Sequence, residues 1–362
     1  MFKFLFAAIL LLHGLIHLMG FAKAFQLAEL KDMATPVSKP LGLAWLLATI
    51  LLVVGFMLWI FKSPHWAWVC LTGIALSQVL VLLFWREAKW GTVANILLLL
   101  VVLPAWASGR FAAMVQREEQ ALTETVNSPT TAPIAENDLA ALPPIVAQWL
   151  RYSGVVGKPA LRHVLLTQSG KMRLKPGGNW MDFNARQHFN TMAPAFVWST
   201  RVRMMPGVFF DGRDKFENGK GQMRIKLLGV VDLVNEKDDP RLNSGTALRL
   251  LGEMCWFPSS ALQPYVQWEA IDSLKAKATF SYGDDAVEGI FTFSPDGEMV
   301  SYEAIRFYGS GPDAIERPWQ VRCTRSEEFG GYRIPKRMSV MWKLPEGDFT
   351  WLEMEIGSWQ GN

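Results

Sequence analysis

Residues 4–22 read FLFAAILLLHGLIHLMGFA, a run of 19 residues without a charge between Lys3 and Lys23. A helix needs about 20 apolar residues to cross a hydrocarbon core roughly 30 Å thick, so this run is long enough to span a membrane. Three more uncharged runs follow it, with 22, 23 and 20 residues, at positions 40–61, 63–85 and 90–109. The sequence therefore predicts an α-helical bundle of four transmembrane spans within residues 1–110.

The basic residues that flank these runs predict an orientation. With four spans, both ends of the bundle lie on the same side of the membrane. The loops on the opposite side carry five Lys and Arg residues, at positions 23, 31, 39, 86 and 89, and the side of the two ends carries four, at positions 3, 62, 110 and 117. Cytoplasmic loops are enriched in Lys and Arg. We therefore expect a multi-pass protein of the inner cell membrane whose C-terminal domain is extracytoplasmic.

Two histidines lie inside the first span. His13 and His17 are four residues apart and share one face of the helix. Ionisable side chains at such depth are candidates for function, and paired imidazoles can ligate haem or a metal. Alternatively, they form hydrogen bonds with Ser77, Gln78 or Asn95 and hold the bundle together. The sequence has no second histidine pair to complete a metal or haem site, so it favours the structural role and predicts no cofactor.

The composition changes after the last span. Residues 117–137 are polar and rich in Thr, Ala and Pro, which is typical of a linker. Two prolines then precede an apolar stripe that ends at Gly154, and this pattern predicts a short helix around Ile145–Tyr152. We expect three parts: a four-helix transmembrane region at 1–110, a linker at 111–137 and a soluble β-rich domain at 138–362.

From Ala160 onward the apolar residues have the period of a β-strand. In residues 275–282, KAKATFSY, the positions with even numbers are Ala, Ala, Phe and Tyr, and those with odd numbers are polar. Such alternation is typical of antiparallel sheets with one buried and one wet face. The runs are separated by turn-forming residues: Asp211–Gly212, Asn218–Gly219, Gly283–Asp285, Pro295–Gly297, Gly330–Gly331 and Pro345–Gly347. We expect about ten to twelve strands in a mostly antiparallel domain, a large curved sheet or incomplete barrel with one or two helices against it.

One predicted helix interrupts the strands. Ser244 is a suitable N-cap for the segment 246–256, TALRLLGEMCW, which ends before a proline. Arg249 and Glu253 are four residues apart on it, and two alternatives follow. They form either an exposed ion pair or a pair that points into a cavity beneath the helix.

The size of the sheet favours a cavity. One helix of about ten residues is roughly 15 Å long, whereas ten or more strands about 4.8 Å apart are far wider. Part of the apolar concave face therefore stays uncovered by this helix and the one around Ile145–Tyr152. We expect a hydrophobic pocket between the sheet and these two helices, with Trp256 and Phe257 at its wall and Arg249 or Glu253 near its mouth.

Several segments resemble those of a bacterial membrane-anchored family of unknown function. They include ALPPIVAQWLRYSGVVGKP at 141–159, FVWSTRVRMMPG at 196–207, LRLLGEMCWFPSSAL at 248–262 and YRIPKRMSVMWKLPEG at 332–347. The resemblance implies the same organisation, a helical bundle followed by a soluble domain. In strand count and layout the soluble domain is also similar to the lipoprotein-carrier (LolA/LolB-like) fold. That likeness implies an open half-barrel with helices against an apolar concave face.

The sequence lacks the motifs of several classes of enzyme and the strong positive charge of a nucleic-acid-binding protein. It contains no GxSxG, HExxH or CxxC motif and no phosphate-binding loop. The net charge of +3 is small and evenly mixed, which excludes a nucleic-acid partner. Cys255 and Cys323 are either a disulfide or two buried thiols.

The sequence favours a membrane-tethered binding module for a lipid, an acyl chain or another apolar ligand, with the bilayer as its other partner. The expected ligand-binding residues are Arg249, Glu253, Trp256 and Phe257, without catalytic or metal-binding residues. One alternative is an enzyme that acts on a membrane-derived substrate with Arg249 and Glu253 in its pocket. Another is a sensor or assembly partner of a second membrane protein.

Overall fold

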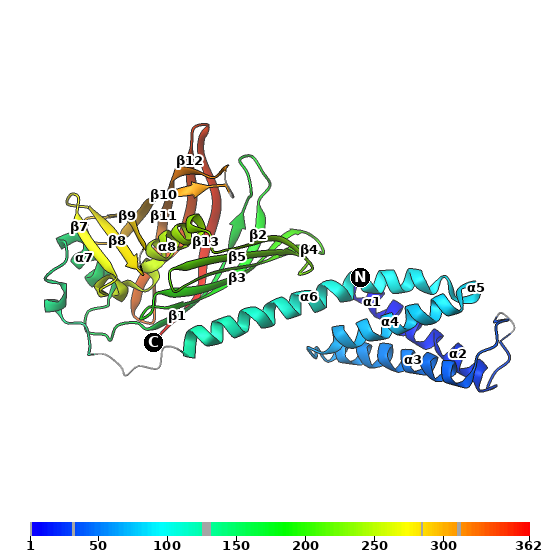
Figure 1. Ribbon diagram of the computed structural model, residues 1–362. Helices are drawn as coiled ribbons and strands as arrows, with labels where there is room; N and C mark the ends of the chain where they lie inside the picture. The colour runs from blue at the N-terminus through cyan, green and yellow to red at the C-terminus, as the bar shows by residue number, and fades with distance from the viewer. Residues whose placement is uncertain (1, 31–32, 125–131, 284, 310–312) are drawn as a thin grey trace. The chain divides into compact units, whose positions relative to one another are not determined.

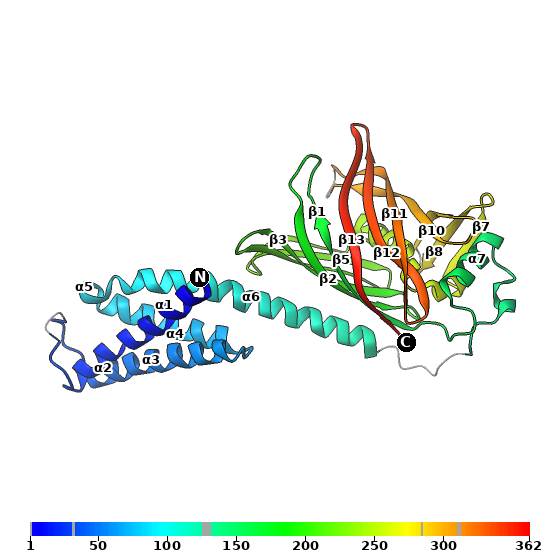
Figure 2. The ribbon, with the colours of Figure 1, turned by 180° about the vertical axis from the view of Figure 1, so that it is seen from behind.

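The computed structural model describes residues 2–30, 33–124, 132–283, 285–309 and 313–362 (Figures 1 and 2). The chain divides into two compact units. The first is Met1–Ala112 with Leu228–Val230, and the second is Ala113–Leu227 with Val231–Asn362. We call them the helical unit and the β unit.

The helical unit contains the apolar helices that the sequence predicted. The helices are α1 (Phe2–Ile16), α2 (Leu18–Ala24), α3 (Lys39–Ile60), α4 (Trp66–Leu83), α5 (Trp85–Ala88) and α6 (Gly91–Glu124). Four stretches are long and apolar enough to cross a membrane: Lys3–Ala24, Lys39–Ile60, Trp66–Leu83 and Gly91–Glu124. The prediction of four long apolar helices is confirmed.

The end of α6 differs from the prediction. This helix runs without a break to Glu124, so residues 111–124, which we assigned to a linker, are helical. Val115 and Leu122 are seven residues apart on one face, and both are buried. This apolar stripe keeps the segment helical despite its polar composition. Residues 125–131 of the predicted linker lie outside the described residues.

The two histidines of the first span form hydrogen bonds with neighbouring helices. His13 Nε2 lies 2.8 Å from Asn95 Oδ1, and His17 Nε2 lies 2.8 Å from Ser77 Oγ. His17 Nδ1 lies 2.7 Å from the carbonyl oxygen of His13, one turn earlier. All four side chains are buried. The predicted hydrogen bonds to Ser77 and Asn95 are confirmed.

The β unit is built on one antiparallel sheet of 13 strands. The strands are β1 (His163–Met172), β2 (Met181–Asn190), β3 (Ala195–Met205), β4 (Val208–Glu217), β5 (Lys220–Leu227), β6 (Val231–Lys237), β7 (Val266–Ala270), β8 (Lys275–Tyr282), β9 (Asp285–Phe293), β10 (Met299–Tyr308), β11 (Ile315–Phe329), β12 (Tyr332–Leu344) and β13 (Gly347–Gly361). Their order is β6-β5-β4-β3-β2-β1-β13-β12-β11-β10-β9-β8-β7. The predicted fold class, apolar helices followed by a mostly antiparallel curved sheet with helices, is confirmed.

One helix fills part of the concave face. Helix α8 (Pro240–Glu253) connects the two edge strands, β6 and β7, and packs on β4 and β5 as well as on β8, β9 and β10. Figures 1 and 2 show it inside the curve of the sheet. The short 3-10 helices η2 (Met254–Trp256) and η3 (Pro258–Leu262) follow it, and α7 (Pro144–Ser153) contacts β8, β12 and η3. The elements η1 (Glu136–Leu139) and α7 precede β1.

Two local predictions are wrong. Asp211–Gly212 is not a turn but lies inside β4, and the chain turns at Pro206–Gly207 instead, where Gly207 has a φ of 83°. Helix α8 begins earlier than predicted, because Asp239 caps it and Ser244 lies within it. The Asp239 carboxylate accepts a hydrogen bond from the backbone N–H of Arg241. The other predicted turns lie between strands, except that Asp284 is outside the described residues.

Two glycines allow α8 to approach the sheet. A Cβ atom at Gly252 would lie 2.6 Å from the ring of Tyr302, and one at Gly245 would lie 3.3 Å from Nη2 of Arg306. The Tyr302 hydroxyl donates a hydrogen bond to the Leu248 carbonyl oxygen at 3.0 Å. Glycine costs a helix interior about 1 kcal/mol relative to alanine, and close approach explains its presence here.

Candidate functional site

A cavity of about 770 Å³ lies between α8 and the concave face of the sheet. Ligand pockets of small molecules occupy about 300–1,000 Å³, so this cavity has the size of a binding site. Most of its wall is apolar. The wall includes Met172, Met181, Phe183, Trp198, Val202, Phe210, Met223 and Ile225 from β1 to β5, and Trp319, Val321, Met338, Val340, Trp342, Phe349, Leu352 and Met354 from β11 to β13. Helix α7 contributes none of the described lining residues, so the prediction that the helix around Ile145–Tyr152 bounds the pocket is wrong.

The strand period produces this wall. On β12, Met338, Val340 and Trp342 are two residues apart and all line the cavity. Successive side chains of a strand point to opposite faces, so every second residue faces the concave side. The wall is thus a direct result of the apolar alternation in the sequence.

Arg249 and Glu253 both line the cavity. Arg249 Nε is 2.7 Å from Glu253 Oε1, and Arg249 Nη1 is 2.7 Å from Asp214 Oδ2 on β4. The three side chains are only 13–17% exposed. Gln187 Nε2 on β2 donates a hydrogen bond to Glu253 Oε2 at 2.7 Å. Of the two alternatives from the sequence, the structure has the pair that lines the cavity.

Burial changes the acidity of this cluster. Burial raises the pKa of Glu253 above its usual range, and Arg249 partly opposes this effect. Burial likewise raises the pKa of Asp214, again against Arg249. A carboxyl group in this setting can hold or release a proton closer to neutral pH than an exposed one. The cluster can therefore bind a polar group of a ligand or exchange a proton with it.

Asp214 and Arg306 are two of the further charged lining residues that the sequence analysis missed. Asp214 lies on β4 in the series Phe210, Gly212, Asp214, and Arg306 lies on β10 in the series Tyr302, Ala304, Arg306. In both strands every second residue faces inward. This alternation could have identified both residues from the sequence. On β4 it was overlooked because Asp211–Gly212 was predicted to be a turn.

The sequence from residue 132 to 354 matches a family described as a family of unknown function, DUF6544. The chain belongs to this family. The matched residues include α7, α8 and all strands but the end of β13, so the cavity lies in the DUF6544 part of the chain. The family resemblance drawn from the sequence is confirmed. No curated protein matches the chain.

Two solved structures have a similar layout. One is from Vibrio parahaemolyticus and is described as an outer membrane lipoprotein-sorting protein domain. Its TM-score is 0.37 at 7% identity, and the match covers 56% of this chain and 86% of that chain. The other is a LolA superfamily protein from Nitrosomonas europaea, with a TM-score of 0.33 at 8% identity and coverage of 59% and 92%. At these TM-scores the likeness is confined to general layout, and the ligand must be inferred from the DUF6544 cavity itself.

The two aromatic residues predicted for the wall have different positions. Trp256 is buried and lines the cavity, and its Nε1 donates a hydrogen bond to the Pro335 carbonyl oxygen at 3.0 Å. Phe257 is buried but is not among the lining residues, because the chain leaves η2 at this point. Its ring packs against Phe189, with 4.7 Å between the ring centroids. The prediction of Phe257 as a wall residue is wrong in the structure. Cys255 and Cys323 are free thiols.

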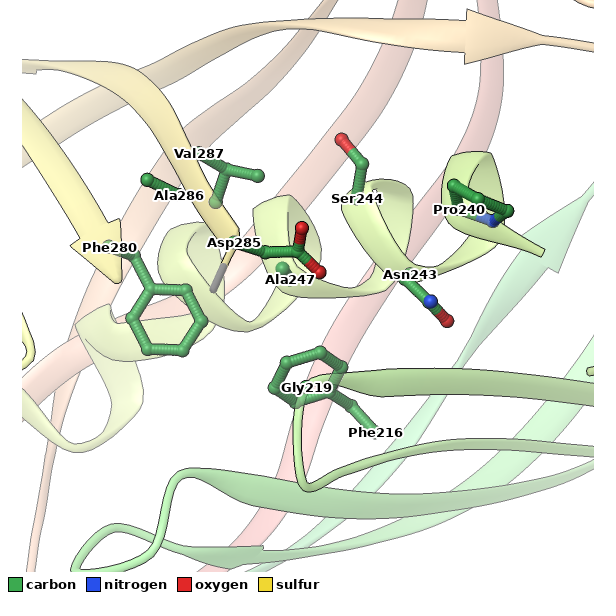
Figure 3. Close-up of a pocket in the computed structure, with 10 residues that line it drawn as sticks. All are labelled: Phe216, Gly219, Pro240, Asn243, Ser244, Ala247, Phe280, Asp285, Ala286 and Val287. Carbon is green, nitrogen blue, oxygen red and sulfur yellow. The ribbon is translucent and has the colours of Figure 1, made fainter. Parts of the chain in front are cut away.

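A second pocket of the DUF6544 domain is much smaller. Figure 3 shows it between the first half of α8, the β4–β5 turn and strands β8 and β9. Its volume is about 70 Å³, far below the size of a typical ligand pocket. Phe216 and Phe280, with ring centroids 6.1 Å apart, are two of its walls. The large cavity is therefore the candidate site.

Proposed function

We propose that the DUF6544 domain is a membrane-tethered binding module that holds an apolar molecule, such as a lipid or an acyl chain, in the large cavity. The observation that carries this proposal is a cavity of about 770 Å³ with walls of Met, Val, Leu, Phe and Trp side chains. Such walls offer few hydrogen bonds to water. The transfer of an apolar ligand from water into the cavity is therefore favourable. Arg249, Glu253 and Trp256 are its proposed ligand-contacting residues. Phe257 is not one of them, because it packs against Phe189 and does not line the cavity.

The four long apolar helices support the tether. They have the length and hydropathy of spans, so the bilayer is the proposed partner of the helical unit. We further propose that this membrane is the inner cell membrane and that the β unit is extracytoplasmic, on the strength of the Lys and Arg residues in the loops. A binding module in this setting takes its ligand from the membrane or delivers it there.

The proposal predicts a bound ligand that depends on the cavity. Native mass spectrometry of the full chain, extracted in detergent, is expected to show a co-purifying lipid. Val340 is buried on the cavity wall, and Val340→Trp fills part of the space that the ligand occupies. We expect this variant to retain about tenfold less ligand than the wild type, a loss of about 1.4 kcal/mol.

A matched substitution on the opposite face provides the control. Ile305 on β10 is 56% exposed and is not a lining residue, so Ile305→Trp is expected to retain the ligand at the wild-type level. Equal retention by both variants would place the lipid outside the cavity. A wild-type protein that carries no lipid and takes up none when it is added would refute the binding module.

An enzyme acting on a membrane-derived substrate is the second candidate. The raised pKa values of Asp214 and Glu253 beside Arg249 favour it, because perturbed carboxyl groups in a cavity are frequent in catalytic sites. The same mass spectra distinguish the two functions. A ligand recovered in a chemically changed form from the wild type, and intact from Glu253→Gln, would establish the enzyme.

A further inference from the structure

The arginines of the cavity differ in how they are neutralised. Arg249 pairs with both nearby carboxylates, Asp214 and Glu253. Arg173 donates a hydrogen bond from Nε to the Thr350 carbonyl oxygen at 2.6 Å, and Arg241 is engaged as well. Among the described residues Arg306 forms neither an ion pair nor a hydrogen bond, and its buried Nε has no partner. One guanidinium of the cavity is thus left without a hydrogen-bonded carboxylate or carbonyl group among the described residues.

Apolar surfaces fix the position of Arg306. Its guanidinium lies over the ring of Trp319 at 4.4 Å and within 5.9 Å of the ring of Trp342. On the other side Gly245 of α8 leaves room for it, since a Cβ atom there would lie 3.3 Å from Nη2. Cation–π contact orients the guanidinium plane but satisfies none of its N–H donors. The side chain is positioned, and its hydrogen-bonding capacity is unused.

The charge of Arg306 persists at neutral pH. Burial and the nearby charge of Arg249 lower the pKa of Arg306 to about 10, which is still well above 7. Arg306 is partly exposed, but its Nε is buried without a hydrogen-bond partner, and a buried polar group without a partner is costly. The carboxylates within electrostatic reach, Asp214 and Glu253, are both hydrogen-bonded to Arg249. An anion from outside the chain would therefore complete this site.

The wall beside Arg306 is apolar over a long distance. Trp319 pairs with Trp342 in the register of β11 and β12, Val321 pairs with Val340, and Cys323 pairs with Met338. These paired positions form a stripe that begins under the Arg306 guanidinium and continues along the two strands. A ligand that places an anion on Arg306 can thus lay an apolar tail along the stripe.

We propose that Arg306 anchors the head of an amphiphile that carries an oxyanion, a carboxylate or a phosphate, while its tail occupies the apolar cavity. This inference rests on the proposed function and specifies the class of ligand. A guanidinium binds carboxylate and phosphate through two parallel N–H donors, which a neutral head group cannot replace. The same oxyanion chemistry is offered by a free anion, so the test includes inorganic phosphate.

The test compares two ligands that differ only in the head group. The full-length protein, extracted in detergent and freed of lipid, is titrated with palmitic acid or hexadecan-1-ol, and occupancy is measured by native mass spectrometry. We expect half-occupancy with the acid at about tenfold lower concentration than with the alcohol, because a hydrogen bond to a charged group adds to the same apolar contact. Arg306→Gln is expected to abolish this preference and leave binding of the alcohol unchanged.

Two further variants control for folding and for surface charge. Arg306→Lys keeps the positive charge and is expected to retain part of the preference for the acid. Arg322 on β11 is exposed and is not a lining residue, so Arg322→Gln is expected to behave as the wild type. The unfolding temperature of each variant shows whether it is folded.

Each remaining outcome counts against a specific statement. If the wild type binds both ligands equally, or Arg306→Gln keeps the preference, the anchor is wrong and the binding module stands. If neither ligand binds, the binding module itself fails. If inorganic phosphate alone displaces palmitic acid at equal concentration, Arg306 belongs to a site for free anions, and the amphiphile is refuted.

Discussion

Each unit of the molecule buries a cluster of polar side chains, and the two clusters are satisfied differently. In the helical unit, His13, His17, Ser77 and Asn95 form a network of hydrogen bonds. With the proton of His17 on Nδ1, bonded to the His13 carbonyl oxygen, the Ser77 hydroxyl can donate to His17 Nε2. Asn95 Nδ2 in turn donates to Gln78 Oε1 at 3.0 Å. The imidazoles are thus already engaged by the protein.

The cluster of the β unit is charged and incomplete. Asp214 and Glu253 both pair with Arg249, whereas Arg306 forms no ion pair or hydrogen bond within the described part of the chain. A buried network in which every polar group has a hydrogen-bond partner makes the surrounding structure rigid. A buried polar group without a partner is rare in proteins, and a binding site for a ligand is one explanation for it. The difference supports a structural role for the histidines, and it supports the proposal that a ligand binds beside Arg306.

The largest effect that separates the two clusters is expected for Arg249→Met. This substitution leaves Asp214 and Glu253, both buried, without their shared cation. Removal of one partner from a buried ion pair costs about 3–5 kcal/mol. Cys255 is 1% exposed, so its thiol is alkylated only when the β unit unfolds. The fraction of alkylated Cys255 is measured by peptide-level mass spectrometry at increasing urea concentrations, and the free energy of unfolding is obtained from this curve.

A surface arginine is the matched control for this variant. Arg337 pairs with Glu355 at 3.0 Å, and both side chains are well exposed, at 53% and 38%. Exposed pairs contribute about 0–1 kcal/mol, so Arg337→Met is expected to change the urea midpoint little. Equal losses for the two variants would show that the cavity cluster is solvated like a surface pair.

The local part of the fold and of the site was predictable from the sequence. The uncharged runs fixed the apolar helices, and the alternation in residues 275–282 fixed the strand class. The spacing of Arg249 and Glu253 also placed them on one helix face, since residues four apart are about one turn from each other. These patterns depend on short stretches of chain, in which the spacing of residues determines which side chains share a face of a helix or strand.

The rest of the site depends on long-range register. Asp214, Gln187 and Arg306 come from three strands that meet around α8 only in the folded sheet, and no local pattern determines which strands lie across from one another. The Asp-Gly pair at 211–212 is frequent in turns, yet here the sheet overrides that preference. Phe257 follows Trp256 directly, and its direction depends on where η2 ends.

A smaller effect is expected in the helical unit for Ser77→Ala. The substitution removes the partner of His17 Nε2 in an apolar interior, which costs about 1–2 kcal/mol. Cys70 is fully buried on the same helix, so its alkylation reports unfolding of this unit. Thr72→Ala is the control, because Thr72 is exposed and bonds only to the Trp68 carbonyl oxygen. An unchanged Cys70 reactivity in Ser77→Ala would show that the network does not stabilise the helices.

The smallest effect tests why α8 contains glycine at its contact with Arg306. Gly245→Ala is expected to stabilise the helix by about 0.5–1 kcal/mol, because alanine is the better helix former and the new Cβ atom meets only the flexible end of Arg306. The same atom crowds the guanidinium, so the preference for palmitic acid over hexadecan-1-ol is expected to fall. Gly252→Ala is the matched control: its Cβ atom would lie 2.6 Å from the buried Tyr302 ring, which costs about 1–3 kcal/mol. A gain in stability at Gly245 with an undiminished preference for the acid would show that the glycine serves packing alone.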